Sequence, residues 1–238
     1  MTQYLLLQVR NDDDPMKLQE LRCFCNALDC DTVDLKHWDL IQGAPTQATL
    51  DEVDVVLLGG SGDYSVAEGG PWLEEALEVM RTLVDQGKPT FASCWGFQAM
   101  ARALGGTVVT DLDRAELGSV EIRLTAEGRQ DPVFGALPSP FAAAMGHQDR
   151  VVDLPSGVTR LAESDRVDNQ AFRINDKPIY CTQFHPELQR DDLVDRLIAY
   201  PQYVEKIAGM TIDAFLDQCH ETPDSNSILR RFVEFAGS

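Results

Sequence analysis

Basic residues are scarce in this sequence. Its 238 residues include 20 Lys and Arg against 39 Asp and Glu, which gives a net charge of −19. A surface this acidic repels phosphate backbones and anionic lipid headgroups, so the composition argues against nucleic acid and membrane surfaces as partners. Hydrophobic residues still make up 44% of the chain, which is enough for a packed core and argues against a disordered protein.

Long apolar runs are missing as well. No stretch approaches the roughly 18 apolar residues that a membrane span requires. The first apolar run, residues 4–9, lacks the basic region and the small-residue cleavage site of a signal peptide. Six cysteines without such a signal are expected to be reduced thiols, which predicts a cytoplasmic location.

A metal-ligand pattern is also absent. Cys23, Cys25 and Cys30 cluster ahead of His37, but their C-x-C-x4-C spacing differs from the C-x2-C pair that is typical of a metal site. We therefore expect structural thiols there, and neither a metal nor a cofactor. The chain shows no internal repeat and no low-complexity segment.

What the sequence does contain is an alternation of apolar strands and amphipathic helices. In the first half we expect strands at 4–9, 32–35, 53–58 and 90–93, and helices at 17–28, 72–86 and 97–104. The strands are continuously apolar rather than alternating, which is typical of a parallel sheet with helices on both faces. The expected fold is therefore α/β, with an open, mostly parallel, flavodoxin-like sheet.

After Gly106 the pattern changes to short strands between turns. We expect these strands at 107–110, 119–124, 141–144, 158–161, 170–174 and 179–183, as a mixed extension of the sheet. From residue 190 onward, apolar residues recur at helical spacing. We expect one domain over residues 1–190 and a C-terminal helical tail over residues 191–238 that packs on the same domain. A lid and a homodimer face are the alternatives for this tail.

The segment 87–106 carries the first candidate for chemistry. Cys94 lies where an expected strand turns into an expected helix, and Gly96 follows two residues later. This is the arrangement of a nucleophile elbow, in which a sharp turn exposes the nucleophile at the edge of the sheet. The N-terminus of the helix should favour the thiolate. The alternative is a buried cysteine that only packs.

The segment 179–188 supplies a base and a residue to orient it. His185 and Glu187 lie two apart, with Pro186 between them. In an extended chain, residues i and i+2 point the same way, so the imidazole and the carboxylate can meet. Glu187 would then fix the tautomer of His185 and stabilise the imidazolium, as in a catalytic triad. A lone H-P-E sequence is more often a surface turn, so the prediction depends on its combination with Cys94.

A glycine-rich stretch follows the expected strand at 53–58. Gly59, Gly60 and Gly62 should lie at the carboxyl edge of the sheet, where open α/β folds bind ligands. Their backbone N–H groups could stabilise an oxyanion. A phosphate site is disfavoured, because neither G-x-G-x-x-G nor a following Gly-Lys-Ser/Thr is present.

Taken together, these segments resemble the class I glutamine amidotransferases, the family with a Cys-His-Glu triad, and in particular the glutaminase domain of GMP synthase and its free-standing relatives. The matching stretches are, in family order, GGSGD at 59–63, CWGFQ at 94–98, ELG at 116–118, GHQDRV at 146–151, NQAF at 169–172 and QFHPEL at 183–188. The combination of C-x-G-x-Q with F-H-P-E is highly specific to this family.

The resemblance implies a role for each matched residue. Cys94 would attack the side-chain amide of glutamine and release ammonia from a γ-glutamyl thioester, with His185 moving the proton and Glu187 orienting His185. The N–H groups of Gly60 and Trp95 would form the oxyanion hole. The residues implied in substrate binding are Gln98, Gly59, His147 and Asp149, with loop structure as the alternative for the last two.

Three functions are compatible with these residues. The first is a glutamine amidotransferase or glutaminase. The chain ends about 50 residues after the triad, too short for a synthetase domain, so we expect either a stand-alone enzyme or a partner, an ammonia-accepting synthetase subunit. The second is a γ-glutamyl hydrolase or peptidase that uses the same triad on γ-glutamyl peptides or conjugates. The third is a non-catalytic protein that keeps the fold.

Overall fold

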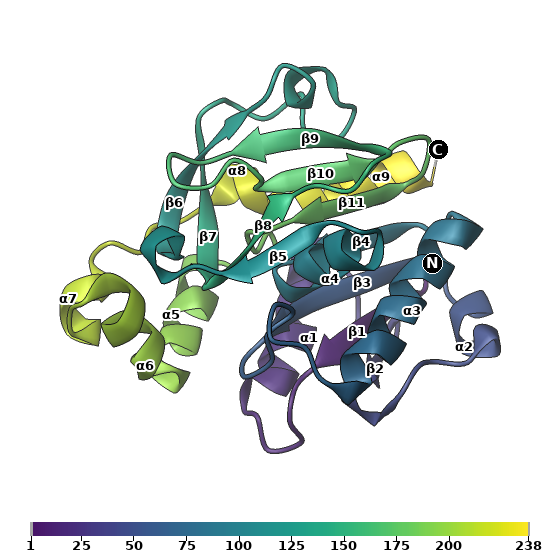
Figure 1. The fold of residues 1–238 in the computed structure, drawn as a ribbon, viewed down its shortest axis with the longest axis horizontal. Coiled ribbons are helices and arrows are strands. Elements are labelled where there is room, and N and C mark those ends of the chain that lie inside the picture. The colour runs from purple at the N-terminus through teal and green to yellow at the C-terminus, as the bar shows by residue number, and fades with distance from the viewer. Residues whose placement is uncertain (1, 238) are drawn as a thin grey trace.

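A nine-stranded sheet forms the centre of the computed structural model, which describes residues 2–237 (Figure 1). The strand order is β2-β1-β3-β4-β11-β10-β9-β6-β7. Five neighbouring strands run parallel, namely β2 (Leu35–Asp39), β1 (Tyr4–Val9), β3 (Val55–Ser61), β4 (Thr90–Ser93) and β11 (Ile179–Thr182). Antiparallel pairing then adds β10 (Ala171–Ile174), β9 (Val158–Glu163), β6 (Glu116–Leu124) and β7 (Phe141–His147). The expected α/β fold, with a parallel sheet and a mixed extension, is confirmed.

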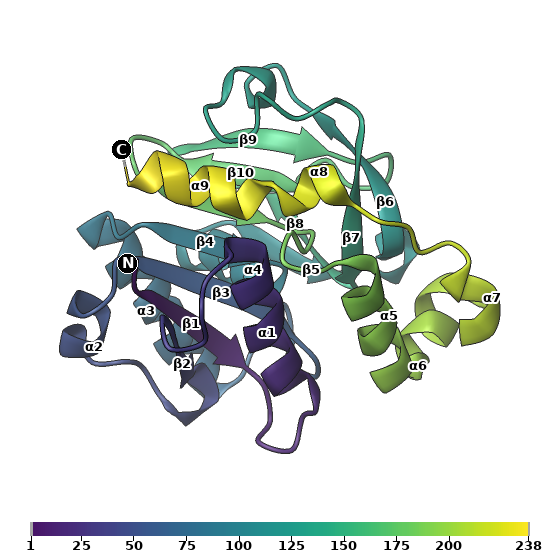
Figure 2. The same ribbon diagram turned by 180° about the vertical axis from the view of Figure 1, so that it is seen from behind.

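Helices cover both faces of the parallel part of the sheet. Figure 1 shows α3 (Pro71–Gln86) and α4 (Trp95–Ala103) in front of the sheet. Figure 2, seen from the opposite side, shows α1 (Met16–Leu28) and α9 (Ile228–Ala236) covering the other face. No helix within residues 2–237 is both long and apolar enough to cross a membrane.

The two helical layers explain why the strands are continuously apolar. On β1, Leu5 and Leu7 pack in the core on the α3 and α4 side, whereas Tyr4 and Leu6 pack in the core that contains residues of α1 and α9. Because successive side chains of a strand point to opposite faces, a sheet buried on both faces favours apolar residues at successive positions.

A third apolar cluster lies at the carboxyl end of the parallel strands. Its helices follow one another as α5 (Arg190–Ala199), α6 (Pro201–Tyr203), a π-helical turn (Val204–Ala208) and α7 (Ile212–Leu216). We call residues 190–216 the cap. It packs through Leu193, Leu197 and Phe215 against Cys23 of α1 and Ala144 of β7. The chain then returns through α8 (Pro223–Asn226) to α9, where Phe232 packs on Tyr180 and Phe91.

One expected strand was misplaced, and two further elements were not predicted. The segment 32–34 forms a turn, and the strand lies at Leu35–Asp39 instead. Its side chains are largely exposed or half-buried, because it is the edge strand, so it lacks the continuous apolar pattern. The sequence pattern also missed α2 (Gln47–Asp51) and β8 (Asp149–Asp153), which pairs with β5 (Thr107–Thr110) in a small second sheet.

Gly96 provides a test of how tightly α4 packs on the sheet. A Cβ atom at Gly96 would lie 2.5 Å from Cβ of Leu58 and 3.2 Å from Cβ of Ala92. We expect Gly96→Ala to lower the free energy of unfolding by about 1–3 kcal/mol, because overpacking forces the helix away from β3. Urea unfolding measures this. Gly146→Ala is the control, since its new methyl group meets only Leu117, at 3.7 Å. An unchanged stability of Gly96→Ala would contradict this packing.

Candidate active site

Cys94 lies in a strained turn between β4 and α4. Its φ of 51° and ψ of −102° place a non-glycine residue in a rarely populated conformation. The turn is held because the Cys94 N–H donates to the Thr182 carbonyl at 2.8 Å and the Cys94 carbonyl accepts from the Gln98 N–H at 3.1 Å. Cys94 thereby lines a cavity of about 300 Å³. The nucleophile elbow expected from the sequence has this geometry.

His185 and Glu187 meet directly behind Cys94. His185 Nδ1 lies 2.7 Å from Glu187 Oε1, and both residues are buried. The two residues meet across a turn that follows β11, not along an extended strand as the spacing argument assumed. The His185 N–H donates to the Ala144 carbonyl at 2.9 Å, which fixes this turn against β7. The structure thus brings all three residues of the expected triad to one place.

The electrostatics of the site favour a charged His185. Burial lowers the pKa of His185, but Glu187 and Cys94 outweigh burial and raise it to about 9. Burial raises the pKa of Glu187, but His185 and then Arg196 outweigh it and hold this pKa below its usual value. An imidazolium beside a carboxylate is the state in which His185 can give a proton to a leaving group.

Arg196 and Glu20 are site residues that the sequence analysis missed. Arg196 Nη1 lies 3.5 Å from His185 Nδ1 and 3.8 Å from Glu187 Oε1. Glu20 is fully buried and accepts from Arg10 Nε at 3.0 Å. No motif marks either residue. The only sequence signal was a charged residue at a buried helical position, on α5 for Arg196 and on α1 for Glu20.

The two backbone N–H groups expected to form the oxyanion hole differ in their hydrogen bonding. Trp95 is the first residue of α4, so its N–H has no acceptor within the helix. The Gly60 N–H, by contrast, donates to Glu20 Oε1 at 3.0 Å. In this structure the Gly60 N–H is therefore bonded to Glu20 and is not directed at Cys94. Gly60 still lines the cavity, and a Cβ atom there would lie 2.9 Å from Cε1 of His185.

The residues expected to bind substrate already have partners within the protein. Gln98 Nε2 donates to the Asp149 carbonyl at 2.9 Å, and both ring nitrogens of His147 contact acceptors, at 3.0 and 3.1 Å. The Asp149 carboxylate accepts from Ser65 Oγ and Thr110 Oγ1, both at 2.6 Å. Gln98, His147 and Asp149 all line the cavity. Because their polar groups already have partners within the protein, a role in substrate binding stays a prediction.

Gly59 is the exception among the expected binding residues. It does not line the cavity. A Cβ atom at Gly59 would lie only 2.3 Å from Oε1 of Glu20, so the residue must be small where β3 passes the buried carboxylate. This packing constraint accounts for the glycine without any contact to a ligand.

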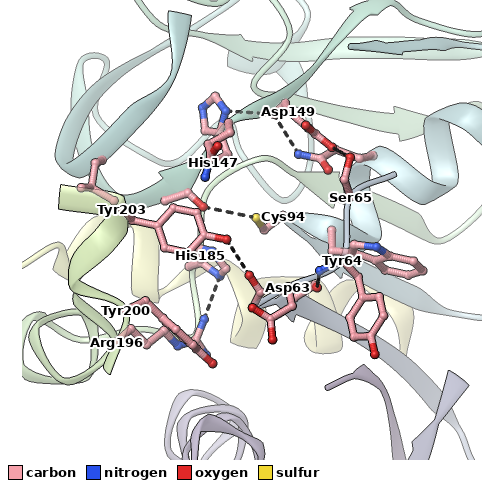
Figure 3. A pocket seen from close by; sticks show the side chains of 18 of the residues that line it. Asp63, Tyr64, Ser65, Cys94, His147, Asp149, His185, Arg196, Tyr200 and Tyr203 are labelled. Atoms are coloured by element: carbon pink, nitrogen blue, oxygen red, sulfur yellow. Dashed lines mark hydrogen bonds between the residues drawn. The ribbon is translucent and has the colours of Figure 1, made fainter. Parts of the chain in front are cut away.

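The cap closes one side of the cavity. Tyr203 Oη donates to the Gly62 carbonyl at 2.5 Å, and Tyr200 Oη donates to Asp14 at 2.6 Å. Figure 3 shows both tyrosines on the same side of the cavity as Arg196, with Cys94 near its centre. Within residues 2–237, no group of three or more His, Cys, Asp or Glu is placed to hold a metal ion.

Comparisons with known proteins identify the family of this chain. The sequence profile of a family described as "Glutamine amidotransferase class-I" matches residues 17–198, and this range includes Cys94, His185 and Glu187. The chain belongs to the class-I glutamine amidotransferase family. Two curated relatives are GMP synthases described as glutamine-hydrolyzing, from Vibrio atlanticus (35% identical over 57% of this chain) and Thermosipho africanus (30% identical over 61%).

Solved structures of amidotransferases share the fold over nearly the whole chain. A glutamine amidotransferase from Thermotoga maritima superposes with a TM-score of 0.78 at 20% identity, covering 99% of this chain and 98% of that one. A glutamine amidotransferase from Methylobacillus flagellatus has a TM-score of 0.72 at 17% identity, covering 98% and 95%. By contrast, the chain spans only about a quarter of the length of the curated GMP synthases, 24% and 28%.

The charge state of His185 in this amidotransferase can be measured without a substrate. We expect its ring to lose its proton with a midpoint near pH 9, because the raised pKa reflects the Glu187 carboxylate and Cys94. Glu187→Gln removes the carboxylate that stabilises the imidazolium, so the midpoint should fall by more than one pH unit. NMR titration of the histidine ring signals, assigned with His185→Asn, measures both values.

The control for this titration is Glu234→Gln, which removes an exposed carboxylate on α9. Its midpoint for His185 should equal that of the unmodified protein. A midpoint near 6.5 in the unmodified protein, the usual value for histidine, would contradict the paired geometry.

Proposed function

We propose that the protein hydrolyses the side-chain amide of glutamine, or of a closely related γ-glutamyl compound, and releases ammonia. The observation that carries the proposal is the constellation of Cys94 on a strained elbow, His185 beside it, and Glu187 at 2.7 Å from His185 Nδ1. An activated nucleophile, a base and a residue that orients the base are the parts that covalent amide hydrolysis needs. A non-catalytic role would leave this arrangement without an explanation.

The chemistry runs in two steps. The Cys94 thiolate attacks the γ-carbonyl carbon, the His185 imidazolium gives its proton to the leaving amide nitrogen, and ammonia departs from a γ-glutamyl thioester on Cys94. A water molecule, deprotonated by His185, then attacks the thioester, and glutamate leaves as the Cys94 thiolate forms again. Glu187 stabilises the imidazolium in both steps.

The developing oxyanion needs donors near the sulfur. The Trp95 N–H at the start of α4 is the donor that the fold presents. The Gly60 N–H could join it after a rotation of the Gly59–Gly60 peptide away from Glu20, and glycines on both sides of the peptide permit that rotation. The Gly146 carbonyl, 3.8 Å from the Cys94 sulfur, is placed to accept a hydrogen bond from the substrate amide.

The mouth of the cavity fits an α-amino acid head group. The exposed carboxylates of Asp63 and Glu68 line it together with the exposed ammonium of Lys206, which lies 2.6 Å from Gln148 Oε1. Charges of both signs suit a zwitterion that carries an ammonium and a carboxylate on one carbon. Glutamine and γ-glutamyl peptides share this end, so the head group alone does not discriminate between them.

A γ-glutamyl hydrolase or peptidase is the second candidate. The observation that favours it is the size of the cavity, since about 300 Å³ reaches the lower end of the range for pockets that hold drug-sized ligands. The same triad would act on both substrates. The leaving group would be an amino acid or another amine instead of ammonia.

For the glutaminase, the partner that we propose is an ammonia-accepting synthetase subunit. The support is the relation to GMP synthases. The region that matches this chain makes up only 24% and 28% of the length of those proteins. We also propose that residues 1–190 and 191–238 work as one unit, because the cap supplies Arg196, Tyr200 and Tyr203 to the cavity. A homodimer stays a prediction.

Substitution of the nucleophile tests the proposed function. We expect Cys94→Ala to lower ammonia release from glutamine at least 10⁴-fold, the scale of losing a triad nucleophile. Cys30→Ser, which changes a half-buried thiol that does not line the cavity, should keep full activity. Glutamate release from γ-glutamyl dipeptides, measured in parallel, separates the two candidates.

Ammonia release from glutamine without dipeptide turnover supports the glutaminase, and the reverse result supports the hydrolase. Turnover of either substrate by Cys94→Ala at the rate of the unmodified protein would overturn the assignment of the nucleophile.

A further inference from the structure

Arg196 reaches the triad from the cap, a part of the chain that carries none of the motifs. It lies on the buried face of α5 together with Leu193 and Leu197, at helical spacing i, i+3 and i+4. The residue is only 9% exposed. A charged guanidinium at this depth is costly to bury unless its surroundings compensate for the charge.

The contacts of Arg196 hold its guanidinium beside the His185–Glu187 pair. Its Nε donates to Gln19 Oε1 of α1 at 2.9 Å, and Nη2 lies 3.8 Å from Glu20 Oε1. Nη1 approaches both His185 Nδ1 and Glu187 Oε1, at 3.5 and 3.8 Å. Since Nδ1 uses its proton for Glu187 at 2.7 Å, the approach of Arg196 is an electrostatic contact and not a hydrogen bond to the ring.

We propose that Arg196 is a positioning residue that holds Glu187 against His185 and places a fixed positive charge beside the His185–Glu187 pair. The inference rests on the proposed function, in which His185 moves the proton and Glu187 orients His185. It assigns to the cap a part in the chemistry, beyond covering the cavity.

The charges around His185 come from several elements. Glu187 follows β11 in the same turn, Cys94 lies between β4 and α4, and Arg196 comes from α5. Behind Arg196 lie Glu20 of α1 and, bonded to Glu20, Arg10 after β1. Tyr200 and Tyr203 of the cap line the same cavity. In this surrounding, Arg196 is the fixed cation that contacts the pair.

The sign of its effect follows from its charge. A permanent cation within 4–6 Å opposes the protonation of an imidazole, with effects of about 1–3 pH units. Arg196 Nη1 lies 3.5 Å from His185 Nδ1, so removal of the charge should move the loss of the His185 proton to higher pH. A residue that only packs would leave this midpoint unchanged.

The test follows the ring signals of His185 by NMR as a function of pH, in the full-length protein and without substrate. His185→Asn assigns these signals. We expect the His185 midpoint of Arg196→Met to move up by about 1 pH unit relative to the unmodified protein. Arg190→Met is the matched control on the same helix, because Arg190 bonds to the Cys219 carbonyl outside the cavity.

If Arg196→Met does not fold, Arg196→Lys tests the proposal instead. Lysine keeps the charge but cannot contact Gln19 and the His185–Glu187 pair at the same time. We expect its His185 midpoint to match that of the unmodified protein within a few tenths of a pH unit, while kcat for glutamine falls about 10-fold and KM stays constant. A His185 midpoint of Arg196→Lys that moves up by a full pH unit would overturn the proposal.

An unchanged His185 midpoint in a folded Arg196→Met protein would also overturn it. Failure of the proposed function gives a different result. A protein that does not turn over glutamine or γ-glutamyl peptides would still show the shifted His185 midpoint, because the titration needs only the contact of Arg196 with the His185–Glu187 pair. Turnover with an unshifted midpoint would leave the proposed function intact and remove Arg196 from it.

Discussion

The strained turn at Cys94 is the constraint on which the rest of the site depends. The turn aims the thiol at the cavity only while β4 enters α4 within a single residue, at a φ of 51° that non-glycine residues rarely adopt. Close packing maintains the strain, because Gly96 lets α4 approach Leu58 and Ala92, and the Thr182 carbonyl holds the Cys94 N–H. Since β11 supplies Thr182 and then leads into His185, the same strand pair positions both Cys94 and His185.

Charge compensation is the second requirement of the site. Glu187 and Glu20 are both at most 1% exposed, and each lies within 3.8 Å of the Arg196 guanidinium. Arg10 completes this group by pairing with Glu20 at 3.0 Å. Buried carboxylates of this kind persist when cations and hydrogen-bond donors surround them. The arrangement ties together α1, β3, β11 and the cap, so the active site is also a junction of distant parts of the chain.

Much of the fold and the grouping of Cys94, His185 and Glu187 could be predicted from the sequence because their signals are local. The core strands are continuously apolar, and the C-x-G-x-Q and F-H-P-E segments each contain their chemistry within five residues. The edge strand Leu35–Asp39 could not be placed, because one exposed face and few contacts leave no clear pattern. The contacts of Glu20 with the Gly60 N–H and with Arg196 join residues 40 and 176 positions apart, which no spacing rule reveals.

The covalent intermediate on Cys94 is the central claim, and mass spectrometry tests it most directly. The protein would be mixed with glutamine, quenched in acid during turnover, digested and mapped. The account predicts a γ-glutamyl group on the peptide that contains Cys94, on no peptide that contains another cysteine, and none in Cys94→Ala. Ammonia release without any adduct on Cys94, or an adduct on a different residue, would contradict it.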